Sequence, residues 1–120
     1  MTIHASETPT RTGQRLRSAQ IRDLLCARIA EEVALDPVWL DRAAAHIASD
    51  RYTSGYEDVW RMLIATGPAA VIEVLTSTSA DADPVKSGNP FAVLGIVSER
   101  ERLAIVDWVY AVASRDPQPA

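Results

Sequence analysis

Apolar residues recur at helical spacing along most of this chain and divide it into amphipathic segments. The first predicted helix covers about Arg17 to Ala34, and its large apolar residues fall on one face: Ile21, Leu24, Leu25, Ile29 and Val33. A second helix is predicted to start at Asp36-Pro37, because Asp caps free amides and Pro has its φ already set for a first turn. Each stripe needs a partner to leave water, which predicts helix-on-helix packing.

Capping and breaking residues predict two more helices in the middle of the chain. Ser54 and Glu57 have the spacing of a capping box, so the third helix should begin near Gly55. It should end at Gly67, and Pro68 should start the fourth helix at once. The expected core contacts of the fourth helix are Val71, Ile72 and Leu75.

The late stretch from Gly88 to Trp108 holds two turn signals and the only Phe of the chain. Asn89-Pro90 is typical of a helix start, and Gly95 is suited to the left-handed conformation that ends a turn. One short helical turn is therefore predicted between them. The turn should insert its apolar side chains into the core, namely those of Phe91, Val93 and Leu94.

A last helix is predicted to follow Ser98, which forms a capping box with Glu101. From Leu103 to Val112 this helix is apolar nearly all round, which is typical of a helix buried on more than one side. Two interpretations remain open. The helix is either the centre of the bundle, or its second buried side belongs to another molecule.

The fold class that follows is all-α, a compact bundle of about five helices plus one short helical turn. The stretch from Thr76 to Ser87 is polar and acidic and should be a loop, in which Ser79 could cap a further short turn. Residues 16–113 are expected to form a single domain. A disordered lead is expected over residues 1–15 and a disordered tail over residues 114–120.

Composition narrows the class of protein. The 120 residues are 48% hydrophobic, which is enough for a core, and the formal net charge is −4, which argues against a general nucleic-acid binder. A single cysteine excludes an internal disulfide and fits a reducing, cytoplasmic location. No run of residues is apolar enough to span a bilayer, and the chain start lacks the apolar core of a signal peptide.

One basic segment contrasts with this acidic whole. Between Thr8 and Arg22 there is no acidic residue, and four arginines are present: Arg11, Arg15, Arg17 and Arg22. They are interpreted either as a solvated helix start or as an arm that contacts phosphates or an acidic partner.

The motifs of common catalytic sites are absent from the sequence. There is no Gly-rich phosphate loop, no H-E-x-x-H and no G-x-S-x-G, and His46 is the only usual base within the expected domain. Asp81 and Asp83 lack the further oxygen ligands of a calcium loop. The sequence therefore predicts no enzyme activity, no catalytic or metal site and no cofactor.

Several elements together resemble a family of small helical bacterial proteins. They are the Trp-containing helix that ends in Gly67-Pro68, the apolar helix after it, and Ser87-Gly88-Asn89-Pro90-Phe91-Ala92 leading into Ser98-x-Arg100-Glu101-Arg102. The corresponding segment of the family reads S-x-PFAG-x-L-S-x-x-ERW-x-I. This chain departs from it at Val93, where the family has Gly, and at Leu103, where the family has Trp.

That family is encoded beside nucleotidyltransferases of the AbiEii/MenT kind. The resemblance implies an antitoxin that binds the neighbour-encoded toxin and covers its basic substrate cleft. Partner contacts are then expected from Asn89, Pro90, Phe91, Arg100, Arg102, Ile105, Trp108 and Val109.

The alternative interpretation is a small DNA-binding transcriptional regulator, in which the four arginines of the basic segment make a weak contact with DNA. A homodimer is also expected, because the last helix carries more apolar surface than one core can cover.

Overall fold

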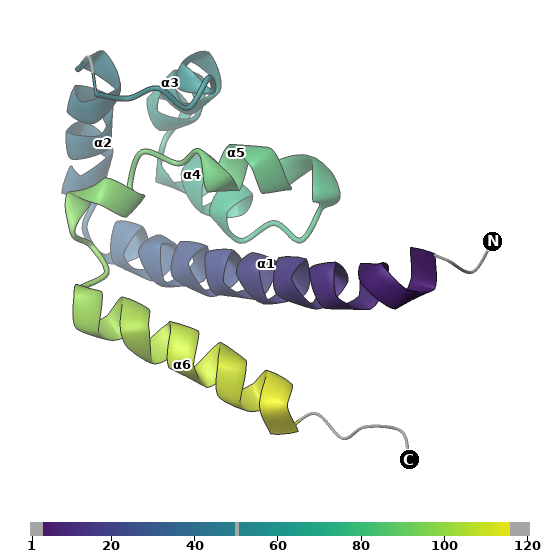
Figure 1. Cartoon of the computed structure of the whole chain (residues 1–120). Helices are drawn as coiled ribbons and strands as arrows, with labels where there is room; N and C mark the ends of the chain where they lie inside the picture. Colours follow the sequence, from purple (N-terminus) through teal and green to yellow (C-terminus); the bar gives the residue numbers. More distant parts are fainter. Residues whose placement is uncertain (1–3, 50, 116–120) are drawn as a thin grey trace.

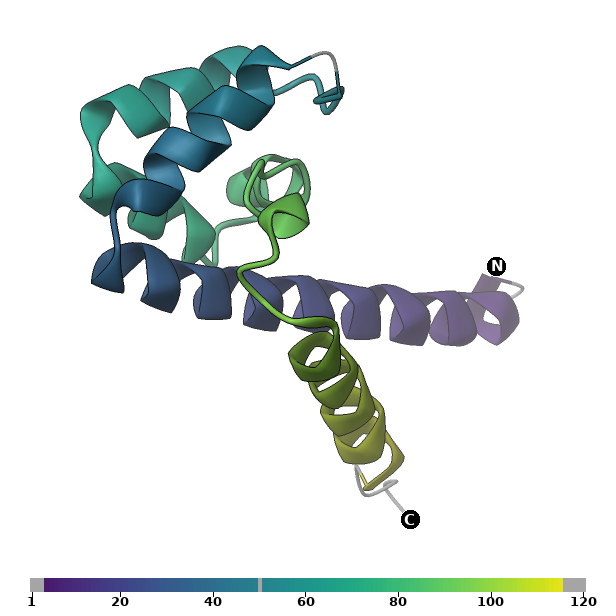
Figure 2. The same ribbon diagram turned by 90° about the vertical axis from the view of Figure 1, so that its left-hand side faces the viewer.

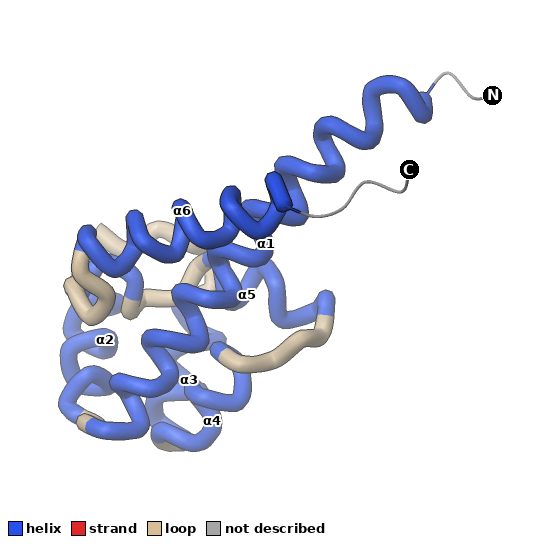
Figure 3. Tube along the Cα trace, turned by 90° about the horizontal axis from the view of Figure 1, so that it is seen from below, coloured by secondary structure: helices blue, strands red, loops and turns tan. Residues whose placement is uncertain are grey.

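The structure, a computed structural model, describes the backbone of residues 4–49 and 51–115 and the side chains of residues 16–49 and 51–112. Within the described backbone every regular element is helical and no strand occurs (Figure 3). The all-α prediction is confirmed. The elements are α1 (His4–Leu35), α2 (Val38–Ala48), α3 (Glu57–Thr66), α4 (Pro68–Leu75), η1 (Ala80–Ala82), α5 (Asp83–Ser87), η2 (Ala92–Leu94) and α6 (Glu99–Arg115).

The long helix α1 divides the molecule into two unequal parts. Helices α2 to α5 lie on one side of α1, and α6 lies on the opposite side (Figure 1). The N-terminal part of α1 extends beyond the other helices, and α6 runs away from the main body at an angle (Figure 2). No helix of the described part has both the length and the apolar character that crossing a membrane requires.

The core lies between α1 and helices α2 to α4. Trp60 of α3 meets Phe91 edge to face with ring centroids 5.8 Å apart, and both side chains are completely buried. Around this pair lie the remaining buried residues: Cys26, Ile29, Ala30, Val33, Leu40, Ala43, Ile47, Val71, Leu75 and Ile96. All of them come from the part of the chain before α6.

The predicted helix starts and stops are largely confirmed. The Asp36 carboxylate accepts a hydrogen bond from the Val38 amide at 3.1 Å, just before α2. Gly67 separates α3 from α4 with φ 127°, and Pro68 is the first residue of α4. At the third predicted start the structure differs, because Ser54 Oγ accepts from the Tyr56 amide and not from that of Glu57. The helix begins two residues later than expected.

The turn at Asn89-Pro90 also forms as expected. Asn89 Oδ1 accepts hydrogen bonds from the amides of Phe91 and Ala92, both at 2.9 Å, and Gly95 is left-handed with φ 79°. Phe91 is buried, but the prediction for Val93 is wrong, because its side chain is 68% exposed. In a turn this short, neighbouring residues point in different directions, so the apolar residues of η2 cannot all face the core.

Three segments expected to lack regular structure contain helix. Helix α1 begins at His4, inside the lead predicted as disordered, because extending an existing helix costs far less than nucleating one. At the other end α6 continues to Arg115. Residues 1–3 and 116–120 lie outside the described residues. The predicted loop from Thr76 to Ser87 contains η1, capped by Ser79, and α5.

Candidate interaction surface

A strap of backbone from Val85 to Phe91, which comprises the end of α5 and the turn before η2, is held in the fold by side chains that are distant in sequence. The Trp60 indole donates to the Val85 carbonyl at 3.1 Å, and the Tyr52 hydroxyl donates to the Gly88 carbonyl at 2.7 Å. A Cβ on Gly88 would lie 3.0 Å from the Cβ of Ser54, so only glycine fits without displacing that loop. The strap therefore positions Phe91 in the core.

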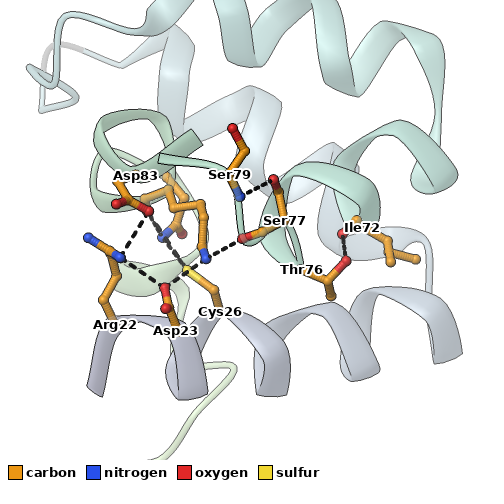
Figure 4. Close-up of polar contacts among 10 residues, drawn as sticks. Arg22, Asp23, Cys26, Ile72, Thr76, Ser77, Ser79 and Asp83 are labelled. Atoms are coloured by element: carbon orange, nitrogen blue, oxygen red, sulfur yellow. Dashed lines mark hydrogen bonds and ion pairs between the residues drawn. The ribbon is translucent and has the colours of Figure 1, made fainter. Parts of the chain in front are cut away.

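Lys86 of this strap is the one charged side chain that is buried within the described part of the chain, at 2% exposure. Its ammonium donates to Asp23 Oδ1 of α1 at 2.7 Å and to the Ser77 carbonyl at 2.8 Å. Figure 4 shows Asp23, Ser77 and the neighbouring Arg22 around this point. Arg22 also reaches Asp83 of α5 at 3.1 Å. The cluster fixes α5 onto α1.

The protonation of this cluster follows from its contacts. Burial alone would raise the pKa of Asp23, but hydrogen bonds from Lys86 and Arg22 outweigh it and place the pKa below the ordinary value. Burial raises the pKa of the Cys26 thiol to about 11. At neutral pH this thiol is buried and protonated, which makes it a weak nucleophile. The contacts of this cluster therefore have a structural role, which is to hold α5 against α1.

Helix α6 is attached to α1 by one contact near each end and by one buried residue between them. The Arg28 guanidinium donates to Glu101 at 2.9 Å, and the guanidinium of Arg17 lies over the Tyr110 ring, 5.1 Å from its centroid. Val109 between them is 1% exposed. Ser98 Oγ caps the helix by accepting from the Glu101 amide at 3.1 Å, while the Glu101 side chain is turned to Arg28.

This attachment leaves most apolar residues of α6 in contact with solvent. Of the two interpretations left open for this helix, a position at the centre of the bundle is wrong, because α6 packs mainly against α1 and lies outside the core. Four of its large apolar side chains are exposed: Leu103 (47%), Trp108 (58%), Tyr110 (49%) and Val112 (43%).

An open apolar groove runs between α6, α1 and α4. Its part next to α6 has a volume of about 280 Å³ and is lined by Leu24, Ala104, Ile105 and Trp108. A larger part of about 620 Å³ continues over α1 towards α4, and its further lining comprises Ala27, Arg28, Ala30, Glu31, Ala34, Ile72 and Thr76. We call the whole feature the α1–α6 groove. Leu24, expected in the core stripe, instead lines this groove with 36% exposure.

Charges on α6 are balanced. The helix carries three acidic and three basic side chains, so the net charge of −4 comes from the rest of the chain. Arg102 pairs with Glu99 one turn earlier at 2.7 Å. Among the described residues that line the α1–α6 groove, one is basic (Arg28) and one acidic (Glu31), so the groove is close to neutral.

The structure separates the residues predicted to contact a partner into two groups. Asn89, Pro90 and Phe91 belong to the strap and its cap, and Phe91 and Pro90 are fully buried. Val109 is buried against α1. Pro90, Phe91 and Val109 therefore build the fold and offer no side-chain surface, while Asn89 is half-buried and its side chain caps the turn. The other four lie on α6 with accessible side chains, namely Arg100, Arg102, Ile105 and Trp108. Ile105 and Trp108 both line the α1–α6 groove.

Half of the predicted basic arm is engaged within the molecule. Arg17 stacks on Tyr110, and Arg22 forms ion pairs with Asp23 and Asp83. Both contacts hold parts of the fold together. Arg11 and Arg15 lie outside the residues whose side chains are described.

His46, the side chain best suited to act as a base, lies against an aromatic ring. Its ring is edge-on to Tyr52, with centroids 5.7 Å apart. Among the described side chains no three His, Cys, Asp or Glu residues come together as a metal site would need.

The groove residues that sequence reasoning missed include several alanines. Ala27, Ala30 and Ala34 recur at helical spacing on α1 and line the groove. That spacing was a usable signal, but it cannot show on which side of α1 the other helices pack.

Comparison of the chain with protein-family models, with curated proteins and with solved structures found no match. The resemblance to proteins encoded beside AbiEii/MenT-like nucleotidyltransferases therefore stays a prediction from the sequence.

Proposed function

We propose that this chain is an interaction protein that binds another protein through the α1–α6 groove and the exposed face of α6. The proposal rests on one observation. An apolar groove on one side of the molecule is lined by Leu24, Ile105 and Trp108. Monomeric proteins rarely leave such apolar surface uncovered, and large patches mark binding sites. An exposed Trp beside a groove is the kind of anchor that dominates interface energies.

The partner we propose is a neighbour-encoded nucleotidyltransferase-type toxin, in keeping with the sequence resemblance. An enzyme that acts on a nucleic acid carries a basic cleft, because its substrate is a polyanion. The acidic surplus of this chain raises the rate of encounter with such a cleft, and the neutral apolar groove supplies the buried contact. Inhibition follows from occlusion of the cleft, with no bond made or broken by this chain.

Co-expression with the neighbouring gene product tests the proposal. The two proteins should co-elute, and this chain should relieve the growth arrest that the partner causes. Trp108→Ala should weaken binding by about 2 kcal/mol or more, that is about 30-fold, measured by calorimetry. Met62→Ala on α3 is the matched control, since Met62 is equally exposed, at 62%, and lies away from the groove.

Failure to co-elute, together with unrelieved growth arrest, would contradict the proposal. The same would hold if both variants bound like the unmodified chain. Binding of promoter DNA by the chain alone, weakened by added salt, would instead support the regulator. None of the described contacts favours that alternative, because Arg17 and Arg22 are occupied within the fold.

A further inference from the structure

The part of the α1–α6 groove next to α6 exists only where the two helices meet. Leu24 of α1 lines it together with Ala104, Ile105 and Trp108 of α6. Helix α6 leaves the main body at an angle from this contact (Figure 2). This part of the groove is therefore present only while α6 is docked on α1.

The contact that docks α6 is small. Val109 is the only buried residue among the described side chains of α6. The ion pair of Arg28 with Glu101 leaves the two side chains 31% and 41% exposed, and Tyr110 beside Arg17 is about half exposed. Because ion pairs with this much exposure to water contribute little, docking depends mainly on Val109.

The core does not need α6 to be complete. Among the described side chains, the core contains none from α6, and the last residue along the chain that belongs to it is Ile96, at 8% exposure. Departure of α6 therefore leaves the packing around Trp60 and Phe91 in place. The core and α6 are two separately packed parts that share α1.

The connection between the core and α6 is short and is fixed at its start. Ile96 is buried and Val97 packs against the core, whereas Ser98 is exposed and caps α6 through the Glu101 amide. Within the described backbone, Ile96 and Val97 form no hydrogen bond with another backbone group outside the helices. Rotation at the Val97–Ser98 junction breaks no such bond, and the cap moves with the helix.

We propose that α6 is a hinged helix, which leaves α1 by rotation at the Val97–Ser98 junction while the core stays folded. Docking assembles the part of the groove next to α6, and opening dismantles it. The hinge acts on the same groove as the proposed function, but it is a property of the chain alone and is tested without any partner.

Hydrogen exchange of the full chain, followed by mass spectrometry of peptides, tests the hinge. An isolated helix of 17 residues is barely stable in water, so α6 loses its protection when it opens. After correction for intrinsic rates, the amides of α6 should exchange at least about tenfold faster than those of α3 and α4. Equal protection of α6 and the core helices would overturn the proposal, because α6 would then open only when the whole chain unfolds.

Two glutamates of the first turn of α6 provide a matched pair of variants. Glu101→Gln removes the charge that pairs with Arg28 of α1, and it should speed exchange in α6 about two- to fivefold. Glu99→Gln is the control, because Glu99 pairs with Arg102 inside α6 and has a similar effect on the helix dipole. An equal increase for both variants would show that the contact with α1 does not hold α6.

Val109→Ala gives an independent measurement of the same opening. Loss of two buried methyl groups at the docking contact should speed exchange in α6 about tenfold, while alanine preserves the helix. Exchange in α3 and α4 should stay within about twofold of the unmodified chain. An equal increase in the core helices would contradict the hinge, since α6 and the core would then open together.

Discussion

Lys86 shows how a single charged residue can join elements that are distant in sequence. Its ammonium lies between Asp23 and the Ser77 carbonyl and is almost completely removed from water. An ammonium is tolerated there because both contacts are short and one partner is a carboxylate. Asp23 is still about half exposed, at 48%, so the pair draws part of its stability from the hydrogen bond to Ser77.

Replacement of Lys86 by Met is expected to destabilise the fold by about 1–3 kcal/mol, because Ser77 and Asp23 lose their donor while the volume is retained. Urea unfolding followed by circular dichroism measures the change. Arg61→Met is the control, since the Arg61–Asp58 pair is exposed and should contribute less than about 1 kcal/mol. Equal losses for both variants would show that Lys86 is not a clamp.

At the scale of elements, local chemistry predicted the boundaries and distant contacts decided the rest. Asn89, Gly67 and Gly95 act on their immediate neighbours, so their roles could be read directly from the sequence. The burial of Lys86 could not, because its carboxylate partner lies 63 residues away. The same holds for the groove, since Leu24 lies on the side of α1 that faces α6, and only the packing of other helices decides which side of α1 becomes the core.

The short turn η2 offers a matched pair of variants. Phe91→Ala should cost about 3–5 kcal/mol, because Phe91 is completely buried against Trp60. Val93→Ala, two residues later in the same turn, should change stability by no more than about 0.5 kcal/mol, since Val93 is 68% exposed. Thermal or urea unfolding of both variants provides the measurement. A small loss for Phe91→Ala would mean that the turn does not insert into the core.

The whole molecule consists of a core shared by α1 to α5 and the strap, and of α6 docked on the far side of α1 (Figure 2). Sequence periodicity predicted the number and class of the helices. It could not predict that α6 lies outside the core, because an apolar face looks the same whether it meets its own chain or another molecule.

A chain ending at Val97, without α6, is therefore expected to fold. It should unfold in one cooperative transition, at a lower temperature than the full chain, because the side of α1 that α6 covers becomes exposed. Scanning calorimetry and circular dichroism provide the measurement. Val109→Asp in the full chain should lower stability similarly, since it places a charge at the buried α1–α6 contact. Loss of all cooperative unfolding on truncation would show that α6 belongs to the folding unit.

The position of α6 has a consequence for how this protein can evolve. Substitutions on its outer side do not disturb the packing around Trp60 and Phe91, so they escape selection for folding. Descendants of the gene can alter what they recognise one residue at a time, while the scaffold that displays the helix persists unchanged.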